Sequence, residues 1–318
     1  MRISASVVFI CLCVIPVSSA TLRFLNREDA EKKIVLEDEF LTRLSPFDIS
    51  SRMCVNRTVD RREFKQFLAG SVLDWSEKEK NLIKKIAGDK IAFIRDSLGV
   101  QLPDTIGFIK TTGKEEGDAA YTRGNTLLLP VALIASAERL EKTLPHELFH
   151  ILSRTNRKLR LELYRLIGFR EGTEVVIPET MRSIRITNPD GYENSYYIEL
   201  ETGTGKSLYV PYLTATIGIR DIEPGKPFFD YLDFSLFEVV KKNDRFSMKM
   251  KDGKTVTLDP QNIGAYIAMI GRNTQYIIHP DEILADNFEL IVNGKKNLPS
   301  PELIEKMSAV FLQFKTFK

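Results

Sequence analysis

Two of the three histidines in this 318-residue chain lie four positions apart, in the segment His146-Glu147-Leu148-Phe149-His150. On an α-helix, residues four apart share one face and are about one turn from each other, so both imidazoles can reach a single cation. Glu147 then lies beside that cation without binding it. This spacing constrains the fold, because the segment must be helical and another part of the chain must return to it with a third ligand.

The H-E-x-x-H pattern predicts one Zn²⁺ per chain, bound by His146 and His150, with Glu147 as the catalytic residue. Zinc held by three protein ligands keeps a fourth position for water and lowers the pKa of that water to about 7, so a neighbouring carboxylate can take its proton. The alternative is a pair of histidines that cap or pack on an ordinary helix, with Glu147 at the surface.

A second helix is expected from residue 279 to residue 288, where Pro280 suits a first turn and apolar residues follow at helical spacing. Glu282 and Asp286 then share one face of it. Together with the pentad, this segment resembles the gluzincin branch of the zincin metallopeptidases. The resemblance implies that Glu282 is the third zinc ligand and that Asp286 accepts a hydrogen bond from the other ring nitrogen of a ligand histidine. Without the pentad, the two carboxylates would be the usual acidic residues of a first helical turn.

Other positions compete for the third ligand. Glu171 and Glu174 follow His150 at the spacing of thermolysin-like members, but neither has an aspartate four residues later, and the glycines around them indicate a loop. The metzincin pattern is excluded, because no histidine follows in the continuation of the pentad. His279 is the remaining alternative, as a ligand, as a transition-state donor or as a residue at the start of a helix.

Two features depart from the thermolysin-like pattern. A long insertion separates His150 from Glu282, so the resemblance covers two short motifs and an arrangement of elements rather than the whole chain. In addition, Pro145 directly precedes the pentad. Because proline removes a helical hydrogen bond and clashes with the preceding turn, we expect the helix to begin at Pro145 or to be kinked there.

The fold class expected is α+β and zincin-like. Residues 105–110 and 125–129 are typical of strands that directly precede the metal-binding helix, and region 119–129 is the candidate for an edge strand that binds extended substrate. They can equally be core strands. The expected organisation is a signal peptide (1–20), an N-terminal helical region (21–104), the zincin sheet with the pentad helix (105–172), a β-rich insertion (173–262) and a C-terminal helical region with the third ligand (263–318).

The N-terminus predicts a secreted or periplasmic protein. Met1-Arg2, an apolar run and Ser18-Ser19-Ala20 form the pattern of a secretory signal cleaved after Ala20. The run is shorter than the ~20 residues of a bilayer span, so no stable membrane anchor is expected after cleavage. A net charge of +2 argues against a nucleic-acid partner, and we expect a monomer.

The function expected is a zinc metallopeptidase that hydrolyses peptide or protein substrates. A further donor to the transition state is usual, and the candidates are Tyr276, His279, Tyr266, Arg154 and Tyr121. Two alternatives stay open: a noncatalytic protein that keeps the fold for binding, and a zinc amidase that acts on a non-protein amide such as a cell-wall bridge. An intact Glu147 argues against the first, because a binding protein needs no base.

Overall fold

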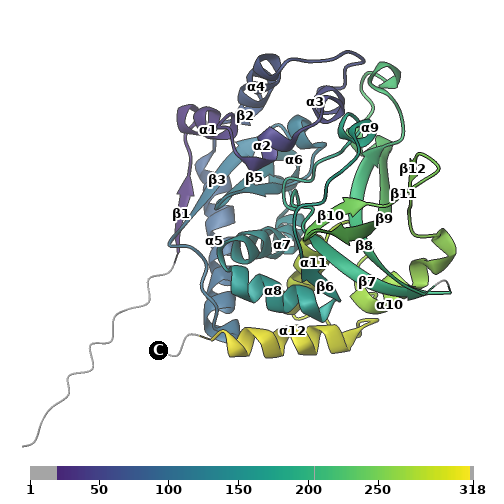
Figure 1. Cartoon of the computed structure of the whole chain (residues 1–318). Coiled ribbons are helices and arrows are strands. Elements are labelled where there is room, and N and C mark those ends of the chain that lie inside the picture. The colour runs from purple at the N-terminus through teal and green to yellow at the C-terminus, as the bar shows by residue number, and fades with distance from the viewer. Residues whose placement is uncertain (1–19, 204, 316–318) are drawn as a thin grey trace, which may run out of the picture.

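The computed structural model describes residues 20–203 and 205–315. Within this part of the chain the fold is mixed α+β, which confirms the expected class: one sheet belongs to the first half of the chain and a second follows the pentad helix (Figure 1). The predicted signal peptide lies outside the described residues, apart from Ala20. Among the described residues, no helix combines the length and apolar character needed to cross a membrane.

The first sheet has the order β1-β3-β5-β4, with β2 paired to β3. β1 and β5 are parallel to β3, whereas β4 is antiparallel to β5 and forms the edge. Strands at the expected positions 105–110 and 125–129 are confirmed as β3 and β5. The bounds are β1 (Thr21–Phe24), β2 (Val72–Leu73), β3 (Thr105–Thr111), β4 (Tyr121–Arg123) and β5 (Thr126–Pro130).

Both faces of this sheet are buried, as the apolar runs of its central strands require. On one face, Phe108 and Leu127 belong to the largest hydrophobic cluster of the protein, which includes the pentad helix. On the other face, Ile109 and Leu128 pack with the N-terminal helices. Those helices are α1 (Arg27–Ile34), α2 (Glu39–Arg43), α3 (Pro46–Arg52) and α4 (Arg61–Gly70).

The region 21–104 was expected to be helical, and the strands β1 and β2 correct that expectation. β1 alternates exposed and half-buried residues, a period of two that a short segment shows weakly. A capping box opens α5 (Glu77–Phe93), in which Ser76 and Glu79 each bond the other's backbone N–H. It continues as a π-helical turn, η1 (Ile94–Leu98), and ends at Gly99 with a φ of 72°.

The pentad helix is α7 (Ala137–Thr155), capped by Ser136, so it begins before Pro145 and not at it. Pro145 cannot donate to the carbonyl of Glu141, its helical partner. The side-chain amide of Asn293 donates to that carbonyl instead, at 3.2 Å. This replacement bond gives the Glu141 carbonyl a protein partner although the helix passes through a proline.

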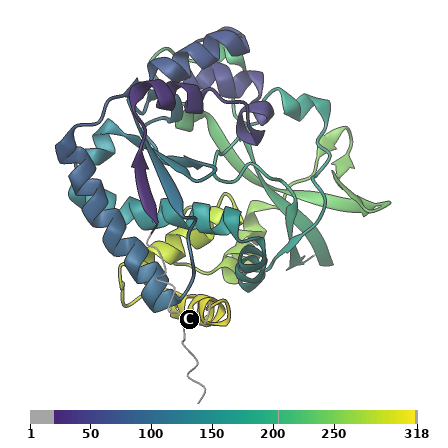
Figure 2. The same cartoon turned by 90° about the vertical axis from the view of Figure 1, so that its left-hand side faces the viewer.

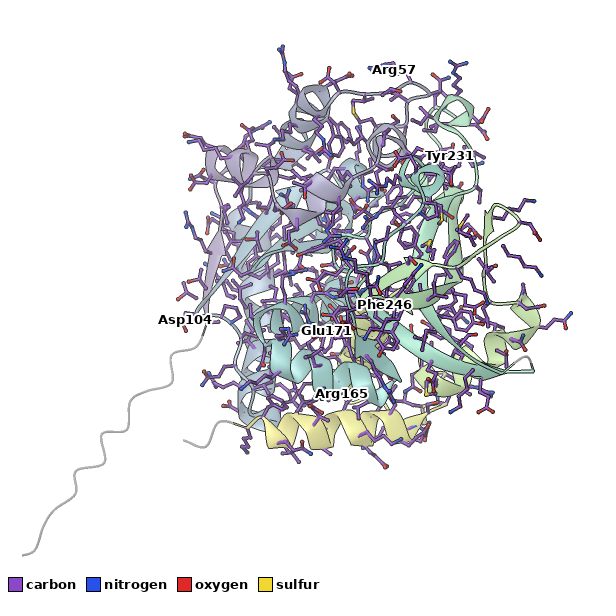
Figure 3. All side chains as sticks on the ribbon, viewed as in Figure 1. Arg57, Asp104, Arg165, Glu171, Tyr231 and Phe246 are labelled. Carbon is purple, nitrogen blue, oxygen red and sulfur yellow. The ribbon has the colours of Figure 1, made fainter. Side chains whose placement is uncertain are left out.

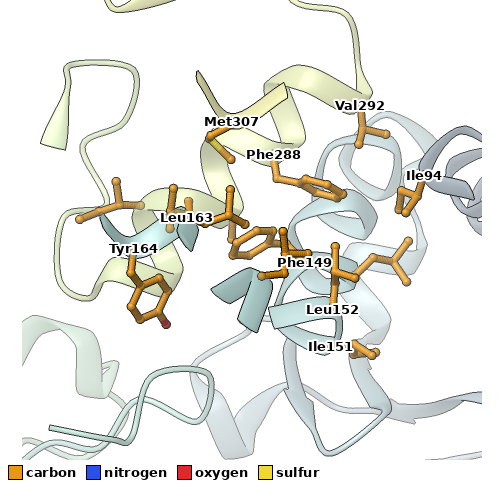
Figure 4. Packing of buried hydrophobic residues seen from close by; sticks show 14 of the residues in the cluster. Ile94, Phe149, Ile151, Leu152, Leu163, Tyr164, Phe288, Val292 and Met307 are labelled. Atoms are coloured by element: carbon orange, nitrogen blue, oxygen red, sulfur yellow. The ribbon is translucent and has the colours of Figure 1, made fainter. Parts of the chain in front are cut away.

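Helices α7, α8, α11 and α12 form a layer on the far side of the first sheet from α1–α4 (Figures 1 and 2). Phe149 of α7 packs against Phe288 of α11 with ring centroids 5.3 Å apart (Figure 4). Phe288 also packs against Phe311 of α12. Each such buried ring contributes about 1.5–3 kcal/mol. The bounds are α6 (Val131–Ile134), α8 (Arg157–Leu166), α9 (Glu179–Arg182), α10 (Ile263–Ile270), α11 (Pro280–Val292) and α12 (Pro301–Gln313).

The second sheet is antiparallel, in the order β10-β9-β8-β7-β6, and matches the expected β-rich insertion. It starts at Phe169, slightly before the expected boundary at 173. Side chains pack the space between this sheet and the rest of the protein. Tyr231 lies at the end near the N-terminal helices, and Phe246 lies on the sheet itself (Figure 3). The bounds are β6 (Phe169–Glu171), β7 (Tyr196–Thr202), β8 (Gly205–Ala215), β9 (Leu232–Lys242), β10 (Arg245–Met248), and a separate hairpin of β11 (Met250–Lys251) and β12 (Lys254–Thr255).

Candidate metal centre

Two helices bring three predicted ligands together. His146 and His150 project from the same face of α7, with ring centroids 4.8 Å apart. On α11, Glu282 directs its Oε2 atom toward both rings, 3.1 Å from Nε2 of His146 and 3.5 Å from Nε2 of His150. The three groups each offer a ligand atom within 4.8 Å of the other two. The structure therefore gathers two imidazole nitrogens and one carboxylate oxygen around one point.

The outer nitrogens of both histidines are held by carboxylates of α11. Asp286 lies 2.9 Å from Nδ1 of His146, the contact expected of it. Asp281 lies 2.7 Å from Nδ1 of His150, a contact that sequence reasoning missed. Asp281 also accepts hydrogen bonds from Ser153 and Tyr164. These contacts fix each ring with Nε2 toward Glu282.

The loop before β7 supplies a further contact to the centre. Asn188 donates from Nδ2 to Oε1 of Glu282 at 2.6 Å, so the two oxygens of that carboxylate have different partners. Asp190 accepts the backbone N–H of Thr122 at 3.0 Å and offers an oxygen within 4.8 Å of ligand atoms of Glu147 and His150. Nothing in the sequence of segment 188–191 predicts contact with α7 or α11, so neither residue was expected at this centre.

The arrangement fits a zinc ion. Nε2 of His150 and Oε2 of Glu147 are buried, and neither has a hydrogen-bond partner among the described residues. An unpaired buried nitrogen aimed at a carboxylate and a second imidazole is the geometry that a cation would satisfy. Two nitrogens and one oxygen, with room for a fourth ligand, is a donor set typical of catalytic zinc.

Burial and charge shift the pKa values of these groups. Burial, with the negative charge of Asp190, raises the pKa of Glu147 to about 8. Burial alone would lower the pKa of His146, but its bonds to Asp286 and Glu282 outweigh that effect and raise it to about 10. Burial would raise the pKa of Glu282, yet the neighbouring histidines hold it well below its usual range. Without metal the imidazoles therefore keep protons, which a bound cation must displace.

A cavity of about 350 Å³ opens beside the pentad. His146, Glu147 and Glu282 lie at one part of its wall, and most of the remaining wall is apolar. Those apolar residues come from the segment before β4, from the insertion and from the segment before α11: Ala119, Ala120, Ile186, Leu213, Phe228, Phe229, Leu232 and Ile278.

A buried ionic cluster closes the cavity at another point. Arg52 of α3 bonds both carboxylate oxygens of Glu116, at 2.6 and 2.9 Å, and Oδ1 of Asp48 at 2.7 Å. It also donates to the carbonyl of Thr187 at 2.9 Å, and the Thr187 N–H donates to Asp48 at 2.9 Å. The charge of Arg52 is thus already matched by two carboxylates, and the cluster fixes the loop that holds Asn188.

Of the predicted transition-state donors, Tyr276 lies at the centre. Its ring stacks on that of His146, with centroids 6.3 Å apart, and it lines the cavity. Tyr276 is 40% exposed as a whole residue, but desolvation of its hydroxyl, together with the charges of Glu282 and Asp190, raises the pKa of Tyr276 well above its usual range. The phenol is therefore a neutral hydrogen-bond donor at any physiological pH.

The other donor candidates have structural positions. His279 caps α11: its Nδ1 accepts the Asp281 N–H at 3.1 Å and its Nε2 faces the Glu193 carbonyl at 3.3 Å, so neither nitrogen is left for metal or substrate. The expectation of a donor at His279 is therefore corrected. Tyr266 donates to the carbonyl of Ile277. Tyr121 is a core residue, and Arg154 bonds Thr122 and Gly124.

The competing third ligands lie away from the centre. Glu171 is in strand β6 (Figure 3), not in a loop as expected. It pairs with Arg157. Glu174 pairs with Arg43 at 2.7 Å. Neither belongs to a group of described residues that could hold a metal. The glycines that predicted a loop flank the short strand β6 at Glu171, whereas Glu174 lies in a loop as expected.

The centre combines a site for one cation, an unpaired carboxylate beside it, a neutral phenol and an apolar cavity. Such a set of groups can activate water and stabilise an oxyanion at one place. A scan against protein-family models, a search of curated proteins and a search of solved structures each find no match to this chain.

Proposed function

We propose that the protein is a zinc-dependent metallopeptidase of gluzincin type, with His146, His150 and Glu282 as the zinc ligands. The observation that supports this most directly is the convergence of the three ligand atoms from α7 and α11, with each histidine oriented by its own aspartate. The sheet placed before α7, with an antiparallel edge strand, also agrees with a zincin-like fold. Secretion by a cleaved signal over residues 1–20 is part of the same proposal.

A zinc ion at this centre would activate a water molecule and polarise the carbonyl of the bond to be cleaved. Glu147 takes a proton from the water, whose oxygen bonds to the carbonyl carbon. The carbon–nitrogen bond then breaks, and Glu147 passes the proton to the leaving amine. The charge of a bound zinc ion would lower the pKa of Glu147 from the value of about 8 in the metal-free site, which would leave the carboxylate ionised and able to accept the proton.

The surrounding residues would orient the substrate. Tyr276 donates a hydrogen bond to the oxygen that gains negative charge. The apolar cavity accepts a side chain and excludes water from the reacting bond. His146 is held by Asp286, and His150 by Asp281, so the ligand geometry does not change as charge develops.

The first test is zinc content. The purified protein should hold about one zinc per chain. Glu282→Ala should lose most of it while keeping its fold, whereas Glu171→Ala and Glu174→Ala, at the competing positions, should keep it. Full zinc in Glu282→Ala would contradict the proposed ligand set. Absence of zinc from the unmodified protein, even after reconstitution, would contradict the metallopeptidase.

The second test separates metal binding from catalysis. Glu147→Gln keeps the size of the side chain and removes the base. It should retain zinc and lose peptide hydrolysis by about 10²–10⁴-fold. If Glu147→Gln cleaves a peptide panel as fast as the unmodified protein, Glu147 is not the base.

A further inference from the structure

Only one of the two carboxylate oxygens of Asp190 has partners in the protein. Thr122 donates to Oδ1 from its backbone N–H, at 3.0 Å, and from its hydroxyl, and Arg154 lies 3.6 Å from the same oxygen. Among the described residues, no hydrogen bond reaches Oδ2. The side chain is only 6% exposed, yet it lines the cavity next to Glu147. One carboxylate oxygen is therefore left for a ligand.

Asp190 also occupies a backbone donor at the open edge of the first sheet, the N–H of Thr122. β4 is the last strand in that sheet, and β5 pairs with its other side. The Thr122 N–H points outward, away from β5, and is already taken by Asp190. Because alternate residues of a strand face the same edge, Ala120 faces outward too, and it lines the cavity. An extended peptide can therefore pair with the edge at Ala120 but must stop before Thr122.

A peptide whose backbone ends beside the Asp190 carboxylate must place one of its two termini next to this negative charge. A protonated α-amino group is attracted to Asp190, whereas a C-terminal carboxylate is repelled. A bound zinc ion would offset the charges of Glu147 and Glu282 in the same wall, and Arg154 pairs with Oδ1 of Asp190, so Oδ2 of Asp190 is the acceptor that no described residue satisfies. Arg52 is the one arginine or lysine among the cavity-lining residues of the described chain, and Asp48 and Glu116 already match its charge. Attraction to Asp190 therefore favours binding of a substrate by its N-terminal ammonium group over binding by its C-terminal carboxylate.

We propose that Asp190 binds the free α-amino group of the substrate, so that the enzyme removes residues from the N-terminus of peptides as an aminopeptidase. This inference rests on the proposed function. Oδ1 stays with Thr122, which orients the carboxylate, and Oδ2 accepts from the ammonium group. Substrates with a blocked N-terminus lack the cation and meet the loop 188–191 with extra bulk.

The test uses two small zinc-binding probes, leucine hydroxamate and N-acetyl-leucine hydroxamate, titrated calorimetrically into the zinc-loaded full-length protein. The two differ only in the amino group, and leucine suits the apolar cavity. The unmodified protein should bind the free-amine probe about 10- to 100-fold more tightly, the range of a charge-assisted hydrogen bond. Asp190→Asn should bind both within about threefold of each other, with unchanged zinc content. Glu193→Gln, which removes a nearby carboxylate outside the cavity, is the matched control and should keep the preference.

Each outcome has one meaning. Equal binding of both probes by the unmodified protein, a comparison that needs no variant, would overturn the role of Asp190 and leave the metal centre intact. Loss of zinc from folded Asp190→Asn would also contradict binding of the α-amino group by Asp190, because Asp190 would then be a metal ligand. If neither probe binds the zinc-loaded protein, the proposed function itself fails.

Discussion

The side-chain amide of Asn293, at the end of α11, donates to the main-chain carbonyl of Glu141 in α7 at 3.2 Å. Pro145 leaves that carbonyl without its helical donor, so Asn293 repairs a defect one turn before the pentad. Asn293 is held in place by Lys90, whose ammonium group donates to Oδ1 at 2.7 Å. The helices that bring the ligands together are thus joined by a polar bond besides their apolar contact.

Asn293→Ala should lower the free energy of unfolding by about 1 kcal/mol, the usual net contribution of a hydrogen bond. In a Pro145→Ala background the backbone gains an N–H at this position that can bond the Glu141 carbonyl, so the same substitution should cost less. A double-mutant cycle by urea denaturation measures the difference, which we expect at about 0.5–1 kcal/mol. Strict additivity would show that Asn293 does not replace the bond that Pro145 removes.

Asp281 and Asp286 should respond differently to substitution. Asp286→Asn should reduce zinc affinity about 10- to 100-fold with little loss of stability, since its side chain is 35% exposed. Asp281→Asn should reduce zinc affinity and also destabilise the zinc-free protein by about 2–3 kcal/mol, because the buried carboxylate accepts from Ser153 and Tyr164. Chelator competition and thermal melts of the zinc-free proteins measure the two effects. Equal destabilisation by both would contradict this distinction.

Asn188→Ala should weaken zinc binding about tenfold, because Oε1 of Glu282 loses its donor and the carboxylate can turn. Asn194→Ala, in the same connection before β7 but away from Glu282, is the control. Competition with a chromogenic zinc chelator gives the affinity. Unchanged affinity in Asn188→Ala would mean that the histidines alone orient the third ligand.

Glu115 should make stability depend on pH independently of the metal centre. Both its carboxylate oxygens are buried without a hydrogen-bond partner among the described residues, and burial raises its pKa from 4.5 to about 7. The folded protein holds this proton up to about pH 7, whereas the unfolded chain releases it near 4.5, so the free energy of unfolding falls as pH rises between these values. The full loss is at most about 3 kcal/mol.

Glu115→Gln should remove that loss. Urea denaturation should give the variant a higher free energy of unfolding than the unmodified protein at pH 8. At pH 5 the two free energies should differ little. The comparison cancels the contribution of the histidines, which both proteins share. A constant difference between the two proteins at both pH values would refute the assignment.

The sequence predicted the parts of the site that have a local period. The i, i+4 spacing of His146 and His150, and that of Glu282 and Asp286, follows from helix geometry alone, and the structure brings all four side chains together. Asn188, Asp190 and Asp281 were missed because their contacts depend on how a loop packs on two helices, which no local pattern encodes. β1 was missed for a similar reason, since four residues give too short an alternation to outweigh the helices that follow.

The cluster of Arg52, Asp48 and Glu116 joins three segments that are far apart in the chain, and its bonds to Thr187 hold the loop that supplies Asn188 and Asp190. A cut that released α3 would take Arg52 and Asp48 with it, leaving Glu116 buried without a counter-ion and the loop without its anchor. The order of the proposed centre therefore depends on the N-terminal helices, because loss of α3 would release the loop that supplies Asn188 and Asp190.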